Sequence, residues 1–306
     1  MKAVVKFFNK KVSIAVTLAA LFVVAALVYS LGYRMAMNKF NSIVGYTQEK
    51  QKMYSKISEV DYNVRNDYIG EIDEDKLFDG TCAGYMKGLT DSNCKFLSAS
   101  DYKSYKNEQE NLPGDVSTGM AGESVGVLSC PCMGRGFSSN FISEFEKLVS
   151  QGVKGIVIDL RNTSKGTEQE VFSALEYMAG SGDVVQTIDV EGNKEVICKG
   201  GNNNLFTNVV VLVNDKTSGL AEVFISALRD TRNIKLVGVE TAGNAVRNKA
   251  VNLSDDSVIV FPDAFYVTSG GKKFFKNGIK PDINVVNKSS DEDLQMKEAV
   301  NLLNNN

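Results

Sequence analysis

Histidine is absent from all 306 residues of the chain. Without an imidazole, the protein lacks the base of Ser-His-Asp and Cys-His catalysis and the commonest protein ligand of zinc. The sequence also contains no internal repeat and no glycine-rich loop of the kind that binds phosphate. Any catalysis must therefore use other side chains, and we predict neither a cofactor nor a metal site.

A basic stripe is also missing outside the N-terminus. The formal charge is −3, but the first fifty residues carry +6 and the remainder carries −9. An acidic bulk without interleaved basic and aromatic residues excludes nucleic acid as a partner. The apolar fraction of 43% and the charged fraction of 23% are ordinary for a globular protein of about two domains.

A long uncharged run lies near the N-terminus. Residues 12–33 read VSIAVTLAALFVVAALVYSLGY, long enough as a helix to cross a hydrocarbon core of about 30 Å. The preceding segment 1–11 carries Lys2, Lys6, Lys10 and Lys11. The positive-inside rule therefore predicts a single-pass plasma-membrane protein whose N-terminus is cytoplasmic and whose bulk, after Arg34, is extracytoplasmic.

A cleaved signal peptide is the competing interpretation of this run. The triplet Ser30-Leu31-Gly32 resembles a cleavage site, but the apolar run exceeds the usual 7–15 residues of a signal peptide. We favour an uncleaved anchor. No cysteine follows the run closely enough for lipidation, so the sequence does not indicate a lipoprotein.

The five cysteines form an odd set for an extracytoplasmic domain, and their pairing cannot be deduced from the sequence. They are Cys82, Cys94, Cys130, Cys132 and Cys198. Cys130 and Cys132 follow a predicted strand, but without a second such pair or any histidine a metal site is poorly supported. We expect the cysteines to behave as small buried apolar residues.

Two segments separate the anchor from the core. Residues 34–110 are polar with spaced apolar positions, which predicts a helical lead-in with loops at Gly70 and at 91–93. Residues 111–123 read NLPGDVSTGMAGE, and their three glycines and one proline predict a linker rather than a regular element.

Strands and helices alternate in the core, residues 124–288. The expected helices are 139–150, one opened by a Thr167-x-x-Glu170 capping box, and 220–228. Short apolar runs predict buried strands at 125–130, 155–160, 209–213, 234–239, 258–261 and 265–268. This order favours an α/β core with parallel strands and an antiparallel addition. In the tail, 289–306, we expect a helix over 291–303 capped by Ser290.

Three segments in consistent order resemble one known family. They are EIDEDKLFDGTCAGYMKGLTDSNCKFLSASDYKSYK from Glu71, KGIVIDLRN from Lys154 and NGIKPDINV from Asn277. Over 68–303 the chain is similar to the carboxy-terminal processing, or tail-specific, proteases, which are serine peptidases with a Ser-Lys dyad. The resemblance implies a ClpP/crotonase-like α/β core behind a helical N-terminal segment, and the apolar run 12–33 adds one N-terminal transmembrane helix.

The same resemblance points to the positions of the dyad. In VNDKTSGLAEVFISALRD, from Val213, the family's serine position is Gly219, and in TAGNA the lysine position 25 residues later is Asn244. A serine attacks only when a base takes its proton, and lysine does so when desolvation lowers its pKa. Glycine has no side chain, and neutral asparagine is no base near pH 7. We therefore predict an inactive site.

Neighbouring residues are weak substitutes for the dyad. At a helix start Ser218 is turned from the nucleophile position by about 100°. Lys249 lies five residues after Asn244, so on a strand it faces the opposite side about 16 Å away. Lys165 with Ser218 or Ser164 is the remaining candidate dyad, and it predicts labelling by serine-directed reagents.

The resemblance also implies an altered oxyanion site. The family's Pro-Gly-Gly turn reads Ser164-Lys165-Gly166 here, so Gly166 and the backbone N–H of Leu220 are the candidate donors. The family's PDZ domain is missing from the expected place, since 111–123 is too short for a domain.

We therefore predict a membrane-anchored pseudoenzyme that binds a peptide or protein, because extended peptides are held chiefly by main-chain pairing. The alternatives are an active serine peptidase with relocated groups and a dimerising module for a membrane partner, as an acidic ectodomain with a tail helix permits a homodimer.

Overall fold

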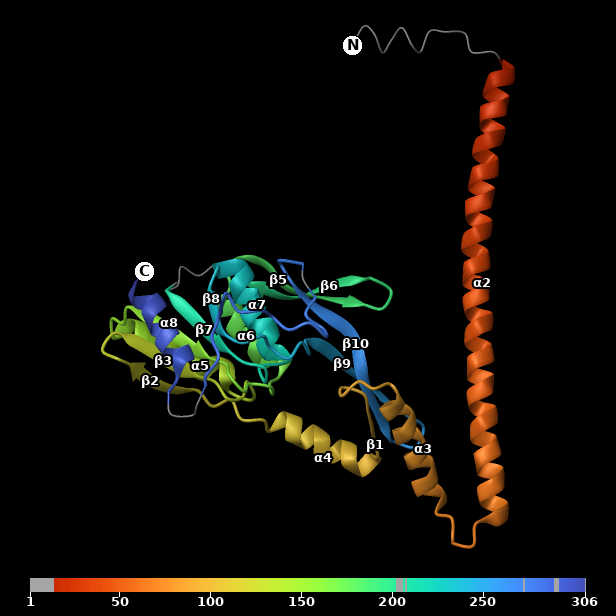
Figure 1. Ribbon diagram of the computed structural model, residues 1–306, viewed down its shortest axis with the longest axis horizontal. Helices are drawn as coiled ribbons and strands as arrows, with labels where there is room; N and C mark the ends of the chain where they lie inside the picture. The colour runs from red at the N-terminus through yellow and green to blue at the C-terminus, as the bar shows by residue number, and fades with distance from the viewer. Residues whose placement is uncertain (1–13, 202–205, 207, 272, 289–291, 306) are drawn as a thin grey trace. The chain divides into compact units, whose positions relative to one another are not determined.

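The computed structural model describes residues 14–201, 206, 208–271, 273–288 and 292–305 (Figure 1). The chain divides into two compact units, Met1–Asp73 and Glu74–Asn306. The predicted lead-in, 34–110, is thus shared between the two units. The predicted cytoplasmic segment 1–11, the first two residues of the predicted span and the predicted cap Ser290 lie outside the described residues.

The first unit contains one long helix, α2 (Ile14–Asp67), of 54 residues. Its segment Leu18–Asn38 is long and apolar enough to cross a membrane, and it overlaps the predicted span 12–33. The helix continues without a break beyond the apolar segment and ends before Gly70, where the sequence predicted a loop. An uninterrupted helix therefore joins the apolar segment to polar sequence.

The second unit begins with α3 (Glu74–Gly88), β1 (Lys95–Leu97) and α4 (Ala99–Glu110). The predicted loop at 91–93 lies between α3 and β1, and the hydroxyl of Ser98 accepts a hydrogen bond from the Asp101 amide to cap α4. Strand β1 was not predicted. It pairs antiparallel with β10 (Val258–Thr268), so the lead-in is attached to the core by a backbone ladder.

One sheet forms the centre of the core, with the strand order β11-β8-β7-β4-β3-β2. Its strands are β2 (Ser117–Ala121), β3 (Val125–Ser129), β4 (Gly155–Asp159), β7 (Val209–Val213), β8 (Lys235–Gly238) and β11 (Ile283–Asn284). Only β2 pairs antiparallel, so the predicted parallel arrangement of the buried strands is confirmed. The prediction of no regular element in 111–123 is wrong, because β2 lies there. Its residues are mostly exposed, so they lack the apolar alternation that marks a strand.

A second, antiparallel sheet has the order β1-β10-β5-β6, and β9 also pairs with β10. The additional strands are β5 (Gly182–Asp189), β6 (Lys194–Gly200) and β9 (Val246–Asn252). The predicted runs 258–261 and 265–268 are both parts of β10. A register shift between Pro262 and Ala264 accommodates the proline within that strand.

Helices cover both faces of the parallel sheet, as Figure 1 shows. They are α5 (Phe137–Ser150), α6 (Glu168–Met178), α7 (Leu220–Arg232) and α8 (Leu294–Asn304). Alternate residues of a strand face opposite sides, and Ile156 and Ile158 pack with the phenylalanines of α5, whereas Val157 packs with Ala299 and Leu303 of α8. The tail helix is therefore part of the core.

Two caps differ from the predicted ones. The carboxylate of Glu170 does not cap its own helix but accepts hydrogen bonds from the amides of Gly136 and Ser138, both at 2.9 Å, at the start of α5. The Thr167 side chain makes no capping bond to α6. In α8 the described N-cap is Asp293, which accepts from the Met296 amide at 3.0 Å.

Candidate functional site

The loops after β7 and β8 lie at the same edge of the sheet, because the carboxyl ends of parallel strands point the same way. The first loop leads to Gly219 and the start of α7, and the second leads to the turn 241–244. The two positions singled out by the sequence, Gly219 and Asn244, are thus brought to one place.

Gly219 is the N-cap of α7, with φ 64° and ψ −125°. Residues with a side chain rarely adopt this conformation, and strained strand-to-helix turns of this type present nucleophiles in hydrolases. A Cβ atom added at Gly219 would lie 4.0 Å from the backbone oxygen of Asn244 and would meet nothing closer. The position is therefore open and faces Asn244.

The carboxylate of Glu222 joins the helix start to the turn. Its Oε2 accepts from the amides of Gly219 at 3.0 Å and Asn244 at 2.7 Å. Its Oε1 accepts from the Gly243 amide at 2.7 Å and from the Thr241 hydroxyl at 2.5 Å. The Glu222 side chain is fully buried, so these four bonds replace the water that burial removed.

The side chain of Asn244 is held by the lead-in. Nδ2 of Asn93 donates to Oδ1 of Asn244 at 2.7 Å, and Nδ2 of Asn244 donates to Oδ1 of Asn93 at 3.3 Å. Asn93 is itself oriented by Asp91, whose Oδ1 accepts from both the amide and the side chain of Asn93 at 2.9 Å. Sequence reasoning missed Asn93, since its Asp-Ser-Asn context indicated only a loop.

A cavity of about 420 Å³ opens in front of these residues. Its lining comes from the lead-in, the loop after β7, the turn after β8 and the segment after β10. It comprises Leu89, Thr90, Asp91, Ser92, Ser218, Ala242, Gly243, Asn244, Phe275 and Lys276. Lys276 is the one lysine in this lining, and sequence reasoning missed it because it lies outside the segments that carry the family's dyad.

Ser218 lines this cavity, and its backbone amide donates to the Thr163 carbonyl at 3.0 Å. Within the described part of the chain, its hydroxyl has no hydrogen-bond partner. Ser164 is exposed on the neighbouring loop.

The candidate lysines lie elsewhere. Nζ of Lys165 forms an ion pair with Glu108 of α4 at 3.0 Å, and both side chains are more than half exposed. Lys249 lies on β9 opposite Phe261 and is also exposed. Of the described residues, only those named above line the cavity, and neither Lys165 nor Lys249 is among them. The structure thus brings neither lysine to Ser218.

The candidate oxyanion donors come from two loops. Gly166 bridges to Met133, since the Met133 amide donates to the Lys165 carbonyl at 2.9 Å and the Thr167 amide donates to the Met133 carbonyl at 3.1 Å. A Cβ atom at Gly166 would lie 2.9 Å from that of Met133, so a larger residue would not fit. The Leu220 N–H is the first of α7 and has no acceptor within its helix.

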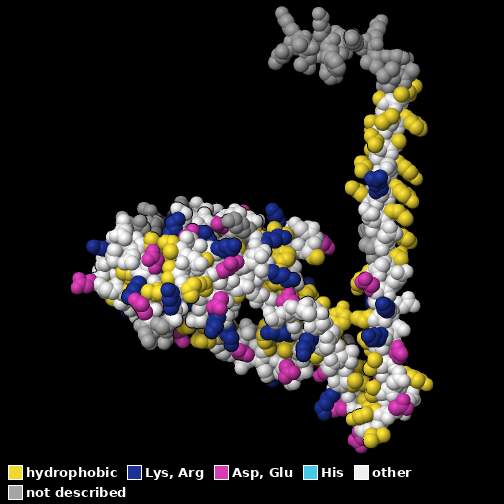
Figure 2. All heavy atoms as spheres, viewed as in Figure 1, with side chains coloured by type: hydrophobic (Ala, Val, Ile, Leu, Met, Phe, Trp, Pro, Cys, Tyr) yellow, Lys and Arg dark blue, Asp and Glu magenta, His cyan; other side chains and the backbone are white. Residues whose placement is uncertain are grey.

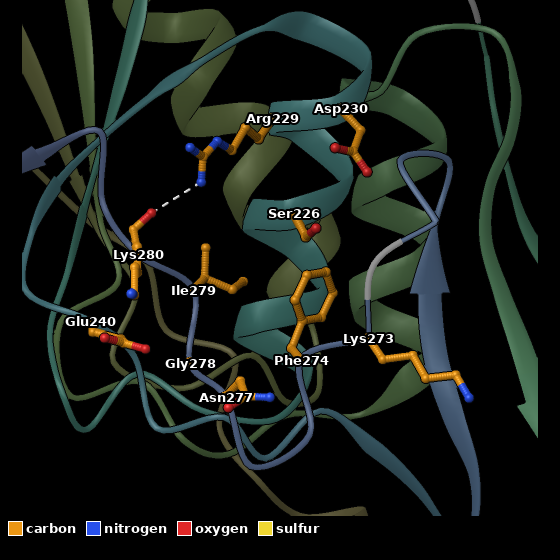
Figure 3. A pocket seen from close by; sticks show the side chains of 10 residues that line it. All are labelled: Ser226, Arg229, Asp230, Glu240, Lys273, Phe274, Asn277, Gly278, Ile279 and Lys280. Carbon is orange, nitrogen blue, oxygen red and sulfur yellow. Dashed lines mark hydrogen bonds between the residues drawn. The ribbon is translucent and has the colours of Figure 1, made fainter.

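The segment that contains Gly278 supports the turn from behind. A Cβ atom at Gly278 would lie 1.9 Å from the Thr241 carbonyl oxygen, so only glycine allows this approach. Asp282 accepts from the Leu236 amide at 2.9 Å and pairs with Arg229 of α7 at 2.9 Å. Arg229 also donates to the Lys280 carbonyl, across a second cavity of about 580 Å³ (Figure 3). The glycine and aspartate of NGIKPDINV therefore fix the backbone behind the site.

The cysteines take no part in this site. All five thiols are unpaired, with Cys130, Cys132 and Cys198 buried and Cys82 and Cys94 partly exposed. Burial raises the pKa of the Cys130 thiol well above its ordinary value, which keeps it protonated and unreactive. Among the described residues, no group of cysteines and carboxylates has the arrangement of a metal site.

Comparisons with known proteins identify relatives of the α/β core. A family model for peptidase family S41 matches residues 124–285. The chloroplastic C-terminal processing peptidase of Tetradesmus obliquus is 33% identical over 140 residues, which are 45% of this chain and 30% of that protein. The carboxy-terminal processing protease CtpA of Bacillus subtilis is 25% identical over 178 residues, which are 58% of this chain and 38% of that protein.

A solved structure resembles the fold over a larger share of the chain. A lipoprotein from Streptococcus agalactiae matches with a TM-score of 0.60 at 17% identity, covering 76% of this chain and 83% of that one. At this identity the match concerns the fold alone. The two matched peptidases are longer proteins, of which this chain spans less than half.

Proposed function

The chain belongs to peptidase family S41, and we propose that it is a membrane-anchored, extracytoplasmic member that has lost its peptidase chemistry and binds peptide or protein segments. The observation that carries the proposal is the pair Gly219 and Asn244. A side chain at Gly219 would approach the backbone of Asn244, and neither residue has a group that attacks a carbonyl or accepts a proton.

The framework around the missing groups supports retained binding. Glu222 holds the turn 241–244 against the start of α7. Asn93 forms hydrogen bonds with the side-chain amide of Asn244. The cavity beside Ser218 and Asn244 remains open. The Leu220 N–H, at the positive end of α7, is the candidate donor to a peptide carbonyl or carboxylate oxygen. A ligand can thus be held without being cleaved.

The anchor and its orientation are part of the proposal. The apolar segment Leu18–Asn38 has the length of a membrane span, and the lysines before it favour a cytoplasmic N-terminus. Because α2 runs on from this segment into polar sequence, an uncleaved helix that serves as both anchor and stalk is favoured over a signal peptide.

An active peptidase with a relocated nucleophile is the second candidate, and the place of Ser218 in the cavity wall is the observation that favours it. Its proposed base, Lys165, is weakened by the ion pair with Glu108 on the surface. Lys276 is the better positioned lysine, since it lines the same cavity.

Self-association is a further part of the proposal, and the exposed apolar side chains of α2 favour it. The tail helix does not supply the surface, because Ala299 and Leu303 are buried against the sheet.

Titration of the full chain in detergent with a pool of fluorescent peptides tests the proposed binding. We expect saturable binding with no change in peptide length, weakened when Ser218→Phe fills the cavity and unaffected by Ser100→Phe on exposed α4. Absence of binding across the pool would overturn the proposal.

A further inference from the structure

Beyond the apolar segment, mostly apolar residues recur on one face of α2 at alternating intervals of four and three residues. The positions on this seam are Tyr46, Lys50, Met53, Ile57, Val60 and Val64. This is the spacing of the core positions of a coiled coil, with Lys50, Ile57 and Val64 at a and Tyr46, Met53 and Val60 at d.

Most of the seam is exposed, and only Met53 among its residues is half-buried. Tyr46 is 67% exposed, Val60 is 58% exposed and Ile57 is 42% exposed. Figure 2 shows hydrophobic side chains densely along the apolar segment of α2 and more sparsely on the part that follows it. A lone helix of this kind is marginal in water, since most helical stability comes from packing of an apolar face. The seam therefore needs a partner helix.

The a positions of the seam agree with pairing to a second copy of the same chain. Ile57 and Val64 are β-branched, as a residues of two-stranded parallel coiled coils are, although d carries no leucine, and a single polar residue such as Lys50 at a fixes register. Two copies anchored by the same N-terminal segment would also run parallel.

The charges beside the seam agree with this arrangement. Lys56 is at a g position and Asp61 at the following e position, which face each other between the two strands of a parallel, in-register pair. Across the described residues Lys56 has no ion-pair partner, while Asp61 pairs only with Arg65 of its own helix at 2.8 Å. Each dimer would thus gain two opposite-charge contacts.

We propose that residues 46–64 of α2 form a parallel, in-register, two-stranded coiled coil with a second copy of this chain. The proposal rests on the proposed self-association and names its surface, orientation and register. The coiled coil joins two chains through their first units, whereas the proposed peptide site lies in the second unit.

Cysteine cross-linking of the full chain in detergent micelles tests the register. Val60→Cys places a thiol at d, where the two copies meet, and Ser58→Cys places one at the outward b position of the same turn. With copper phenanthroline as oxidant, we expect a covalent dimer from Val60→Cys at least tenfold more abundant than from Ser58→Cys or the unsubstituted chain. Equal cross-linking of the two variants would overturn the proposal.

A charge swap tests the same register without cysteine chemistry. We expect Lys56→Glu to weaken dimerisation about threefold or more by placing like charges together, and Lys56→Glu with Asp61→Lys to restore it. If neither change alters the dimerisation affinity, the proposed coiled-coil surface is contradicted, whereas self-association itself is not. Peptide binding measured on the same variants reports separately on the proposed site, and we expect it to be unchanged.

Discussion

The side-chain amide of Asn93 donates to that of Asn244 over 2.7 Å, although the two residues lie 151 positions apart. The side-chain amide at the expected base position is therefore hydrogen-bonded within the protein. A turn of the lead-in thus closes one side of the candidate site. Removing the side-chain amide of Asn93 leaves both Oδ1 and Nδ2 of Asn244 without this partner.

We expect Asn93→Ala to lower the free energy of unfolding by about 1–2 kcal/mol, the usual cost of losing partly buried hydrogen bonds. Ser92→Ala is the matched control, because Ser92 is an exposed neighbour that also lines the cavity. Urea denaturation followed by circular dichroism measures both. Equal stability of the two variants would mean that the amide pair does not hold the lead-in.

Glu222→Gln tests the proposed role of the buried carboxylate. An amide offers one oxygen and one NH₂ group to four donors, so at least one donor loses its acceptor and faces another donor. We expect a loss of about 2–4 kcal/mol in the free energy of unfolding. Glu240→Gln, at an exposed glutamate, is the control and is expected to change it by less than about 0.5 kcal/mol.

Gly219→Ser tests the backbone strain and the open space at the turn that begins α7. A serine at φ 64° and ψ −125° costs about 1–3 kcal/mol in unfolding free energy, whereas Gly80→Ser in α3 needs no such backbone and is expected to cost little. Gly219→Ser alone is expected to stay unreactive toward a fluorophosphonate.

The double variant Gly219→Ser with Asn244→Lys restores both members of the dyad. Because Glu222 still fixes the two backbones, we expect slow fluorophosphonate labelling of the introduced serine in this variant and none with Asn244→Met in place of lysine. Mass spectrometry of the labelled peptide identifies the site. Identical behaviour of the lysine and methionine variants would show that the framework is not poised for chemistry.

Asp293 gives the fold a pH dependence. Burial opposes its ionisation, but hydrogen bonds from Arg161, the Met296 amide and Asn287 outweigh burial and hold the pKa of Asp293 below its ordinary value of 3.8. A depressed pKa means that the stabilisation is complete above that value and is lost as pH falls through the lower folded-state value.

Asp293→Asn is therefore expected to lower the melting temperature at pH 6 by a few degrees and to flatten the acid side of the stability curve. The exposed neighbour Glu292→Gln is expected to leave the curve unchanged. Calorimetry between pH 3 and pH 7 compares the three proteins, and parallel acid limbs for Asp293→Asn and the unsubstituted chain would contradict the role of this cap.

Much of the core could be predicted from the sequence because its signal is local. The run of β7 is fully apolar, that of β4 is apolar up to Asp159, and the spacing from Gly219 to Glu222 marks a helix start. Strand β2 and the β5–β6 hairpin were missed because they are exposed or polar along much of their length. Their pairing depends on neighbours distant in sequence.

The site could be predicted only in part for a similar reason. Gly219 and Asn244 follow from motif spacing, but the contact of Asn244 with Asn93 joins the lead-in to the core and leaves no periodic trace. Glu170 likewise has the spacing of a capping box for α6, but tertiary packing directs its carboxylate to α5. Long-range hydrogen bonds of this kind require the folded structure.

The central claim is that the site binds without reacting, and fluorophosphonate labelling of the full chain, run beside digestion of an unfolded protein, tests it most directly. We predict no labelled serine and no cleavage, with Ser218→Ala indistinguishable from the unsubstituted chain. Labelling that disappears in Ser218→Ala, together with cleavage, would contradict the account and move the catalytic site to the adjacent serine.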